Sequence, residues 1–248
     1  MILPAYSSQY YSYGARGLLS SNSVLLIAAL AILVLGLIAQ ARVRSVFRQY
    51  FSLRASCGLT ASQVAGELLR NNGSSVSVRR IQGSLTDNYD PRTGCVSLSS
   101  DVFDSSSVAA IAVAAHECGH VMQYEHGYNA IKLRNTILPA AKIGSHLSYL
   151  LVIAGLFLPV FGHTVSMIGV VLFGFVLAFQ LLTLPIELNA SQRALDMLNA
   201  GGYITIGEEE SAARKVLRAA AFTYVVAVLS AAVTFLRLLA YANSGRRN

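Results

Sequence analysis

Four apolar runs lie along the 248-residue chain, and each is long enough to cross the hydrocarbon core of a bilayer. The first covers residues 24–41. A longer apolar zone, 143–185, is interrupted at Gly162, His163 and Thr164, which predicts a hairpin of two spans over 143–161 and 165–184. The fourth run covers 219–240. The pattern predicts a mainly α-helical integral membrane protein with about four transmembrane helices.

The first run has a second interpretation, a cleaved signal peptide, because Ala39, Gln40 and Ala41 have the small-x-small form of a cleavage site. The run is longer than a typical signal h-region, a single basic residue (Arg16) precedes it, and several arginines follow it. These features favour a retained anchor. Residues 1–23, rich in tyrosine and serine, are expected to form a mobile tail, and residues 241–248 a second, short tail.

Composition and charge agree with a membrane location. The mean hydropathy is +0.53, 54% of residues are apolar and only 12% are charged, about half the usual fraction. The net charge of +7 comes from basic residues that flank the apolar runs, so a bilayer explains it better than nucleic acid. Since cytoplasmic flanks are enriched in Lys and Arg, we expect segments 42–142 and 186–218 in the cytosol and the N-terminus outside. Arg246 and Arg247 disagree with this orientation.

The first polar segment, 42–142, has the pattern of a small α+β region. Thr60 and Gln63 form a capping box that predicts a short helix ending near Asn71 to Gly73. Segments 76–81 and 95–98 predict two short strands with a turn at 87–91 between them. Asp104 and the serines at 105–107 then offer N-caps for a helix from Val108 to about Glu125. This segment is the expected catalytic region.

The chemistry is concentrated in that last helix, which contains His116, Glu117, Cys118, Gly119 and His120, the H-E-x-x-H arrangement. Residues four apart on a helix differ by about 40° in direction, so both imidazoles leave one face and can converge on one zinc ion. Glu117 lies beside that face, where it can take a proton from a bound water. The alternative is two unrelated histidines on a buried helix.

A catalytic zinc site needs a third protein ligand and an open position for water. His126 is one candidate, at the metzincin spacing, although Gln123 stands where that pattern has glycine. Glu187 is the better candidate, because the third span emerges there on the side assigned to the first motif. Its alternative role is a carboxylate at the membrane surface that begins a helix after Pro185. The three cysteines, Cys57, Cys95 and Cys118, have no metal-type spacing and are expected to be free thiols.

Four ordered motifs resemble those of the YugP-type neutral zinc metallopeptidases: residues 58–65, 85–92, 114–120 and 183–191. The resemblance implies a bacterial inner-membrane zinc peptidase, distantly similar to HtpX and the CaaX prenyl protease, with a zincin-like site at the cytosolic face. Glu187 and Ala190 also resemble the gluzincin third-ligand motif, in which Ser191 stands at the position of the usual aspartate that supports a zinc-binding histidine. The expected metal ligands of the single Zn²⁺ are His116, His120 and Glu187, and the expected catalytic base is Glu117.

The expected function is therefore a membrane-embedded zinc metalloendopeptidase that acts at the cytosolic face of the bacterial inner (plasma) membrane. Segment 185–218 is expected to be a cytosolic helix that carries the third ligand. Expected partners are a peptide or protein substrate, membrane proteins among them, and the lipid bilayer, with no nucleic acid; a regulatory membrane partner is left open. A site-2 type of protease, cutting within the bilayer, is disfavoured because only 108–115 is continuously apolar before His116. The rival from another class is a catalytically silent, zinc-stabilised membrane scaffold or adaptor.

Overall fold

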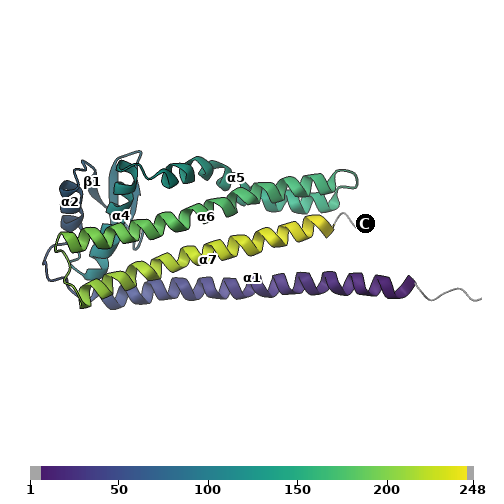
Figure 1. Ribbon diagram of the computed structural model, residues 1–248, viewed down its shortest axis with the longest axis horizontal. Helices are drawn as coiled ribbons and strands as arrows, with labels where there is room; N and C mark the ends of the chain where they lie inside the picture. The colour runs from purple at the N-terminus through teal and green to yellow at the C-terminus, as the bar shows by residue number, and fades with distance from the viewer. Residues whose placement is uncertain (1–6, 245–248) are drawn as a thin grey trace, which may run out of the picture. The chain divides into compact units, whose positions relative to one another are not determined.

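The computed structural model describes residues 7–244, so parts of both expected tails, 1–6 and 245–248, lie outside the described residues. Helices and strands follow one another along the chain as shown in Figure 1. The helices are α1 (Ser7–Phe51), α2 (Ala61–Asn71), α3 (Ser100–Phe103), α4 (Val108–Glu125), α5 (Asn129–Phe157), α6 (Gly162–Ala200) and α7 (Glu208–Ser244); the strands are β1 (Ser77–Ile81), β2 (Asn88–Asp90) and β3 (Cys95–Ser99).

Four of these helices are long and apolar enough to cross a membrane, counting the described residues only: α1 from Ser23, α5, α6 and α7. In the most apolar window of α1 only 6% of residues are buried inside the protein. Side chains as apolar as Ile27 and Leu30 are more than half exposed there. A surface of this kind is stable in contact with lipid and not with water. The protein is thus a mainly α-helical membrane protein with a small α+β region.

The chain divides into two compact units. The first contains residues up to 36, 138–179 and from 227 onward, and it is built only from parts of α1, α5, α6 and α7 among its described residues. Its small core is apolar: Val152, Val170, Phe173, Ala231, Leu238 and Ala242. The second unit contains residues 37–137 and 180–226, and every residue with candidate chemistry belongs to it.

Helix α6 is continuous through Pro185. The sequence pattern separated a span ending at 184 from a helix beginning at 185, whereas the structure joins both in one element of 39 residues. Proline lacks the backbone N–H and usually interrupts a soluble helix, but helices of membrane proteins tolerate it where neighbouring groups satisfy the freed carbonyl. Glu187 is consequently carried by the same helix as the third apolar run.

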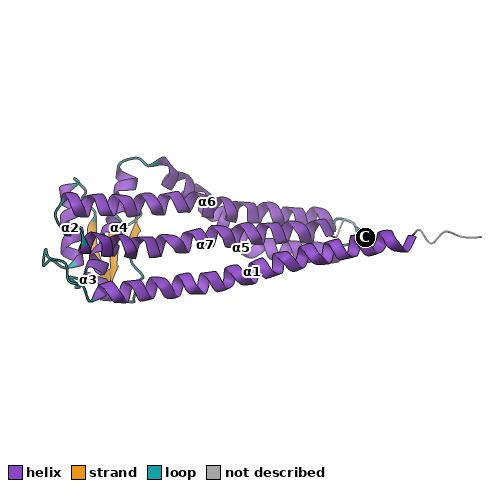
Figure 2. Ribbon diagram, turned by 60° about the horizontal axis from the view of Figure 1, so that its bottom comes forward, coloured by secondary structure: helices purple, strands orange, loops and turns teal. Residues whose placement is uncertain are grey.

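The second unit contains a three-stranded sheet in the order β1-β3-β2, and Figure 2 shows strands nowhere else in the described chain. β1 pairs with β3 in parallel, with Val78 opposite Val96, and β2 pairs with β3 in antiparallel, with Tyr89 opposite Val96. The sequence predicted a turn at 87–91 and only two strands. That prediction was incomplete, because residues 88–90 form a third strand and the chain reverses after them, at 91–94. There Asp90 accepts a hydrogen bond from the Arg92 amide and Gly94 has a φ of 59°.

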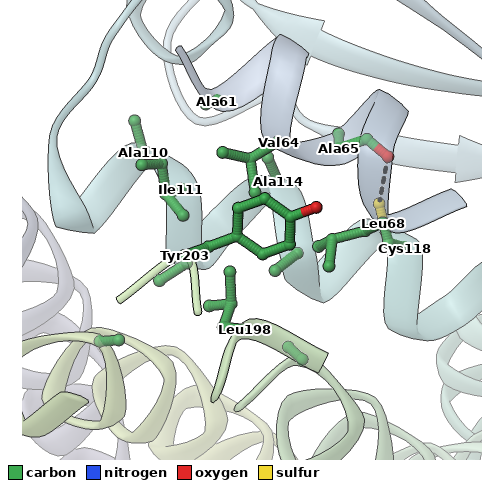
Figure 3. Close-up of a cluster of buried hydrophobic side chains, with 14 of the residues drawn as sticks. Ala61, Val64, Ala65, Leu68, Ala110, Ile111, Ala114, Cys118, Leu198 and Tyr203 are labelled. Carbon is green, nitrogen blue, oxygen red and sulfur yellow. Dashed lines mark hydrogen bonds between the residues drawn. The ribbon is translucent and has the colours of Figure 1, made fainter. Parts of the chain in front are cut away.

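Part of the core of the second unit lies between α2 and α4, which are side by side in Figure 3. The capping box predicted at Thr60 is present: its hydroxyl accepts from the Gln63 amide, and Gln63 accepts from the Thr60 amide. Apolar side chains, several of them alanines, pack the two helices together: Ala61, Val64, Ala65 and Leu68 on α2 face Ala110, Ile111, Ala114 and Cys118 on α4. Helix α4 is therefore held firmly along the face opposite its histidines.

Candidate metal centre

His116 and His120 lie one turn apart on α4, as the sequence predicted from their spacing. Their ring centroids are 4.8 Å apart and the rings are nearly perpendicular. The helix begins where Ser107 accepts a hydrogen bond from the Ala110 amide and ends at its C-cap, His126, followed by Gly127 with a φ of 69°. Both histidines are thus in the rigid interior of the helix and not at a fraying end.

Glu187 of α6 meets the two histidines. Its Oε2 lies 3.3 Å from Nε2 of His116 and 3.5 Å from Nε2 of His120, and the residue is only 4% exposed. Ligand atoms from these three residues all lie within 4.8 Å of one another. His126, the other candidate third ligand, is not part of this cluster. The structure therefore brings together the three residues that the sequence singled out, from two helices that are far apart along the chain.

The spacing of Glu187 from the two histidines fits a zinc ion. Zinc binds imidazole nitrogen and carboxylate oxygen at about 2.0–2.1 Å, so tetrahedral angles place two neighbouring ligand atoms roughly 3.3–3.4 Å apart. The two His-to-Glu187 distances, 3.3 and 3.5 Å, are close to that separation. Three protein donors leave the fourth tetrahedral position for water, as in catalytic and not structural sites.

The remaining nitrogen of each imidazole has its own partner. Ser191 Oγ lies 3.2 Å from Nδ1 of His116, and Gln123 Oε1 lies 2.9 Å from Nδ1 of His120. Engaging Nδ1 leaves Nε2 of both rings facing Glu187, which is the arrangement that metal-binding histidines use. Ser191 thus supports a histidine at the position where the gluzincin pattern has aspartate, but with a neutral hydroxyl.

A glycine allows the two ligand-bearing helices to approach closely. A Cβ atom built on Gly119 of α4 would lie 2.5 Å from the backbone oxygen of Ala190 on α6, closer than real carbon atoms come. Gly119 lies next to His120, and Ala190 lies one turn after Glu187. Any side chain at this position would push α6, and Glu187 with it, away from the histidines.

Glu117 lies beside the cluster and lines the same cavity, of about 210 Å³, as His116 and Glu187. Glu117 is 8% exposed, and burial raises the pKa of its carboxyl group, although His116 and His120 lower it. Burial alone would lower the pKa of His120, but its hydrogen bond to Glu187 and the nearby Glu117 carboxylate raise it. Two carboxylates facing two imidazoles make a pocket that favours a cation.

Two residues of the site were missed by sequence reasoning. Tyr224 of α7 lines the cavity together with Glu187. Gln123 is fully buried and also contacts α6. Nothing in the local pattern around either residue marks it, because each role depends on a contact with a helix distant in sequence.

The cysteines lie outside the metal cluster. Cys118 points away from the cluster, with Sγ 3.7 Å from the Ala65 carbonyl oxygen (Figure 3), and burial raises the pKa of its thiol. The three cysteines Cys57, Cys95 and Cys118 are free, as expected.

Comparison with known proteins shows to which family the chain belongs. A family model described as "Putative neutral zinc metallopeptidase" matches residues 25–243. The chain belongs to this zinc metallopeptidase family. It is also 39% identical over 218 residues to a Bacillus subtilis (strain 168) protein named "Putative membrane protease YugP", which covers 88% of this chain and 96% of the relative. No solved structure matches the chain. The resemblance seen in the four motifs is confirmed.

Membership of the zinc metallopeptidase family implies zinc, and the donor set of the cluster agrees. Two imidazoles and one carboxylate are ligands that catalytic zinc accepts. His116, His120 and Glu187 are the group of three potential metal ligands found among the described residues. The family and the four apolar helices together describe a membrane-associated zinc metallopeptidase.

Proposed function

We propose that the protein is a zinc metalloendopeptidase embedded in the bacterial inner membrane, hydrolysing peptide bonds of protein substrates at the cytosolic face. One observation carries the proposal: the ligand atoms of His116, His120 and Glu187 lie within 4.8 Å of one another, and the buried Glu117 lines the same cavity. A structural zinc site does not need a free carboxylate beside its ligands, whereas peptide hydrolysis needs a base there.

His116, His120 and Glu187 would hold one Zn²⁺. When bound, zinc polarises a peptide carbonyl and acidifies a water molecule. Ser191 and Gln123 hold the two imidazole rings so that Nε2 of each faces the metal position.

Glu117 accepts a proton from the attacking water as the water oxygen bonds to the carbonyl carbon. It then delivers that proton to the amide nitrogen as the carbon–nitrogen bond breaks, so the carboxylate is regenerated. Burial, which raises the pKa of Glu117, makes it a stronger base. Tyr224 lines the same cavity, where its hydroxyl can donate a hydrogen bond to the carbonyl oxygen as negative charge develops on that oxygen.

The walls of the cavity favour substrate segments close to the membrane surface. Val216 and Leu217 precede the fourth apolar run, and Ala220 and Tyr224 lie within it, yet all four line the cavity. The cavity is therefore lined by residues on both sides of position 219, where the apolar run of α7 begins. Most of its lining is apolar, which suits an apolar side chain next to the scissile bond.

The cytosolic orientation rests on the basic residues that flank the apolar runs. Ser75, exposed between α2 and β1, provides a test of it. In a variant with Cys57 replaced by serine, Ser75→Cys should react with an impermeant thiol reagent only after the cells are opened. Reaction in intact cells would contradict the proposed topology.

Peptidase activity is tested by Glu117→Gln. Glutamine keeps the size of glutamate but does not accept the proton, so the purified variant should retain zinc and the fold while cleaving a peptide library at least 10²-fold more slowly, a typical loss for a missing general base. Glu208→Gln, which changes an exposed glutamate at the start of α7, is the matched control and should cleave like the unmodified protein.

The scaffold alternative makes a different prediction for the same pair of proteins. If the unmodified protein and the Glu117→Gln variant both hold zinc and neither cleaves any peptide of a broad panel, a zinc-stabilised membrane scaffold or adaptor explains the site better. Cleavage at equal rates by both proteins would show that Glu117 is not the base and that the proposed mechanism is wrong.

A further inference from the structure

A second cleft lies between α1 and α7 of the second unit, and the proposed peptidase function does not use it. It has a volume of about 550 Å³. Residues at helical spacing on both helices line it, among them Arg42, Gln49 and Tyr50 of α1 and Lys215, Arg218 and Phe222 of α7. The candidate metal centre contributes none of its residues to this cleft.

The cleft is strongly basic and has no internal counter-charge. Three of its lining side chains, Arg42, Lys215 and Arg218, are cations, and no carboxylate lines it. Within residues 24–51 of α1 there is no aspartate or glutamate at all. Exposed cations gathered in one concave surface attract an anion more strongly than the same charges spread over a convex one.

The nearest carboxylates of α7 are engaged elsewhere. Glu209 accepts hydrogen bonds from the amides of Ser56 and Thr205 at 2.9 and 2.8 Å. Glu210 forms an ion pair with Arg214 at 2.6 Å. None of the three cations of the cleft forms an ion pair with a carboxylate in the described part of the chain.

One cation is already held in place. Lys215 Nζ donates to the Tyr50 hydroxyl at 3.2 Å and lies 5.6 Å from the centre of the Tyr50 ring. The contact holds the ammonium group beside Tyr50 within the cleft and leaves other donor hydrogens unused. A ligand anion therefore meets a cation whose side chain has already lost part of its freedom.

The cleft lies where the apolar runs of α1 and α7 end, and this position indicates which kind of anion would bind there. Arg42 is the first residue after the apolar run 24–41, and Arg218 is the last before the run 219–240. Both line one cleft, so the two span ends meet at the depth where phospholipid phosphates lie. Phe222, one turn into the apolar run and 38% exposed, adds an apolar wall on the membrane side.

We propose that this cleft binds the headgroup of an anionic glycerophospholipid. The phosphate oxygens accept hydrogen bonds from the guanidinium groups of Arg42 and Arg218, and Lys215 adds a third positive charge. Gln49 and Tyr50 are within the same cleft to bond the headgroup hydroxyls, and Phe222 packs against the start of an acyl chain. A free phosphate ion would use the cations but not the apolar wall. The proposal does not depend on peptidase activity.

The test uses the purified full-length protein and nanodiscs of phosphatidylcholine with or without phosphatidylglycerol. Lipid retention is measured by native mass spectrometry and affinity by titration with phosphatidylglycerol. The unmodified protein should retain phosphatidylglycerol in preference to phosphatidylcholine. Since a basic residue at a membrane surface contributes about 1 kcal/mol, the double variant Arg42→Gln/Arg218→Gln should bind phosphatidylglycerol about thirtyfold more weakly. Arg42→Lys/Arg218→Lys should regain most of the affinity.

The matched control is Arg44→Gln/Arg48→Gln, which removes the same charge from exposed positions of α1 that do not line this cleft. It should weaken phosphatidylglycerol binding much less than Arg42→Gln/Arg218→Gln, because neither Arg44 nor Arg48 lines the cleft that would hold the headgroup. Equal losses of affinity in the two double variants would show that phosphatidylglycerol binds to the basic surface in general and would overturn the proposal. Equal retention of phosphatidylglycerol and phosphatidylcholine would overturn it as well. Displacement of phosphatidylglycerol by inorganic phosphate at millimolar concentration would equally overturn it, in favour of a soluble phosphate. Thermal unfolding without anionic lipid checks that each variant is folded.

Discussion

Gln123 accepts a hydrogen bond from Nδ1 of His120, with 2.9 Å between the two atoms. The direction follows from the other end of the same amide, whose nitrogen donates to the Ile186 carbonyl at 2.8 Å and to the Asn189 side chain at 3.0 Å. The oxygen of Gln123 is therefore the atom that faces His120, and an amide oxygen can only accept. His120 must carry its proton on Nδ1, which leaves the lone pair on Nε2.

Replacing Gln123 by leucine should weaken zinc binding. Leucine has a similar volume but neither orients His120 nor holds α6 at Ile186, so we expect a loss of about 10- to 100-fold in zinc affinity, typical for a lost partner of a metal-binding histidine. Competition with a chelating dye measures it. Gln192→Leu is the control, because Gln192 is exposed and its side chain bonds to Asp196 and to no other residue between 7 and 244. Equal zinc affinity in both variants would contradict a positioning role for Gln123.

Glu187→Ala should deplete the protein of zinc, whereas His126→Ala should not. Glu187 lies within 3.5 Å of both histidine Nε2 atoms, and His126 is the C-cap of α4, outside the cluster. Losing one of three ligands removes a metal bond, while losing a histidine at the helix end removes none. Metal analysis of the two purified variants distinguishes them. Zinc loss in His126→Ala alone would indicate a metzincin-like ligand set.

Two glycine substitutions should change stability in opposite directions. Gly119→Ala places a methyl group against the backbone oxygen of Ala190, and forcing extra atoms into a packed contact costs about 1–3 kcal/mol. Gly66→Ala, in the interior of α2, meets only the flexible end of Arg70 at 3.4 Å and should stabilise the helix by roughly 0.5–1 kcal/mol. Thermal unfolding in detergent should therefore show a lower Tm for Gly119→Ala and a higher Tm for Gly66→Ala.

Local patterns were sufficient where the structure depends on local rules. The capping box at Thr60, the helix from Val108 to Glu125 with its two histidines, and the strands near 77–81 and 95–99 all appear as their spacing predicts. Each depends on residues within one or two turns of each other. The apolar runs likewise identify the four long helices, because hydrocarbon thickness sets a length that composition alone reveals.

Features that depend on distant contacts were not accessible from one sequence. The segment of β2 was expected to be a turn, because Asn88 and Asp90 are unfavourable in strands. Pairing with β3 nevertheless makes this segment a strand. The helix α6 continues through Pro185, which the local rule treats as a boundary. Gln123 gains its role only because Ile186 and Asn189 of α6 lie against it. In each case a tertiary contact outweighs the local preference.

Tyr224→Phe should separate a catalytic role from a positioning role. The substitution removes only the hydroxyl of a residue that lines the cavity together with Glu187. If that hydroxyl stabilises the carbonyl oxygen as it becomes negative, kcat should fall by about 10²- to 10³-fold, as for other lost oxyanion donors, while KM and zinc affinity stay close to their original values.

Tyr203→Phe is the control for the Tyr224 experiment, because Tyr203 bonds to Glu67 and Asn71 away from the cavity. It should lower stability by about 1–3 kcal/mol, the net value of two typical hydrogen bonds, and leave kcat unchanged. A positioning role for Tyr224 predicts the reverse of a catalytic one: zinc affinity would fall because Glu187 is less well held, and added zinc would restore the rate. Restoration of the rate by added zinc would therefore show that the Tyr224 hydroxyl positions Glu187 and does not stabilise the substrate carbonyl.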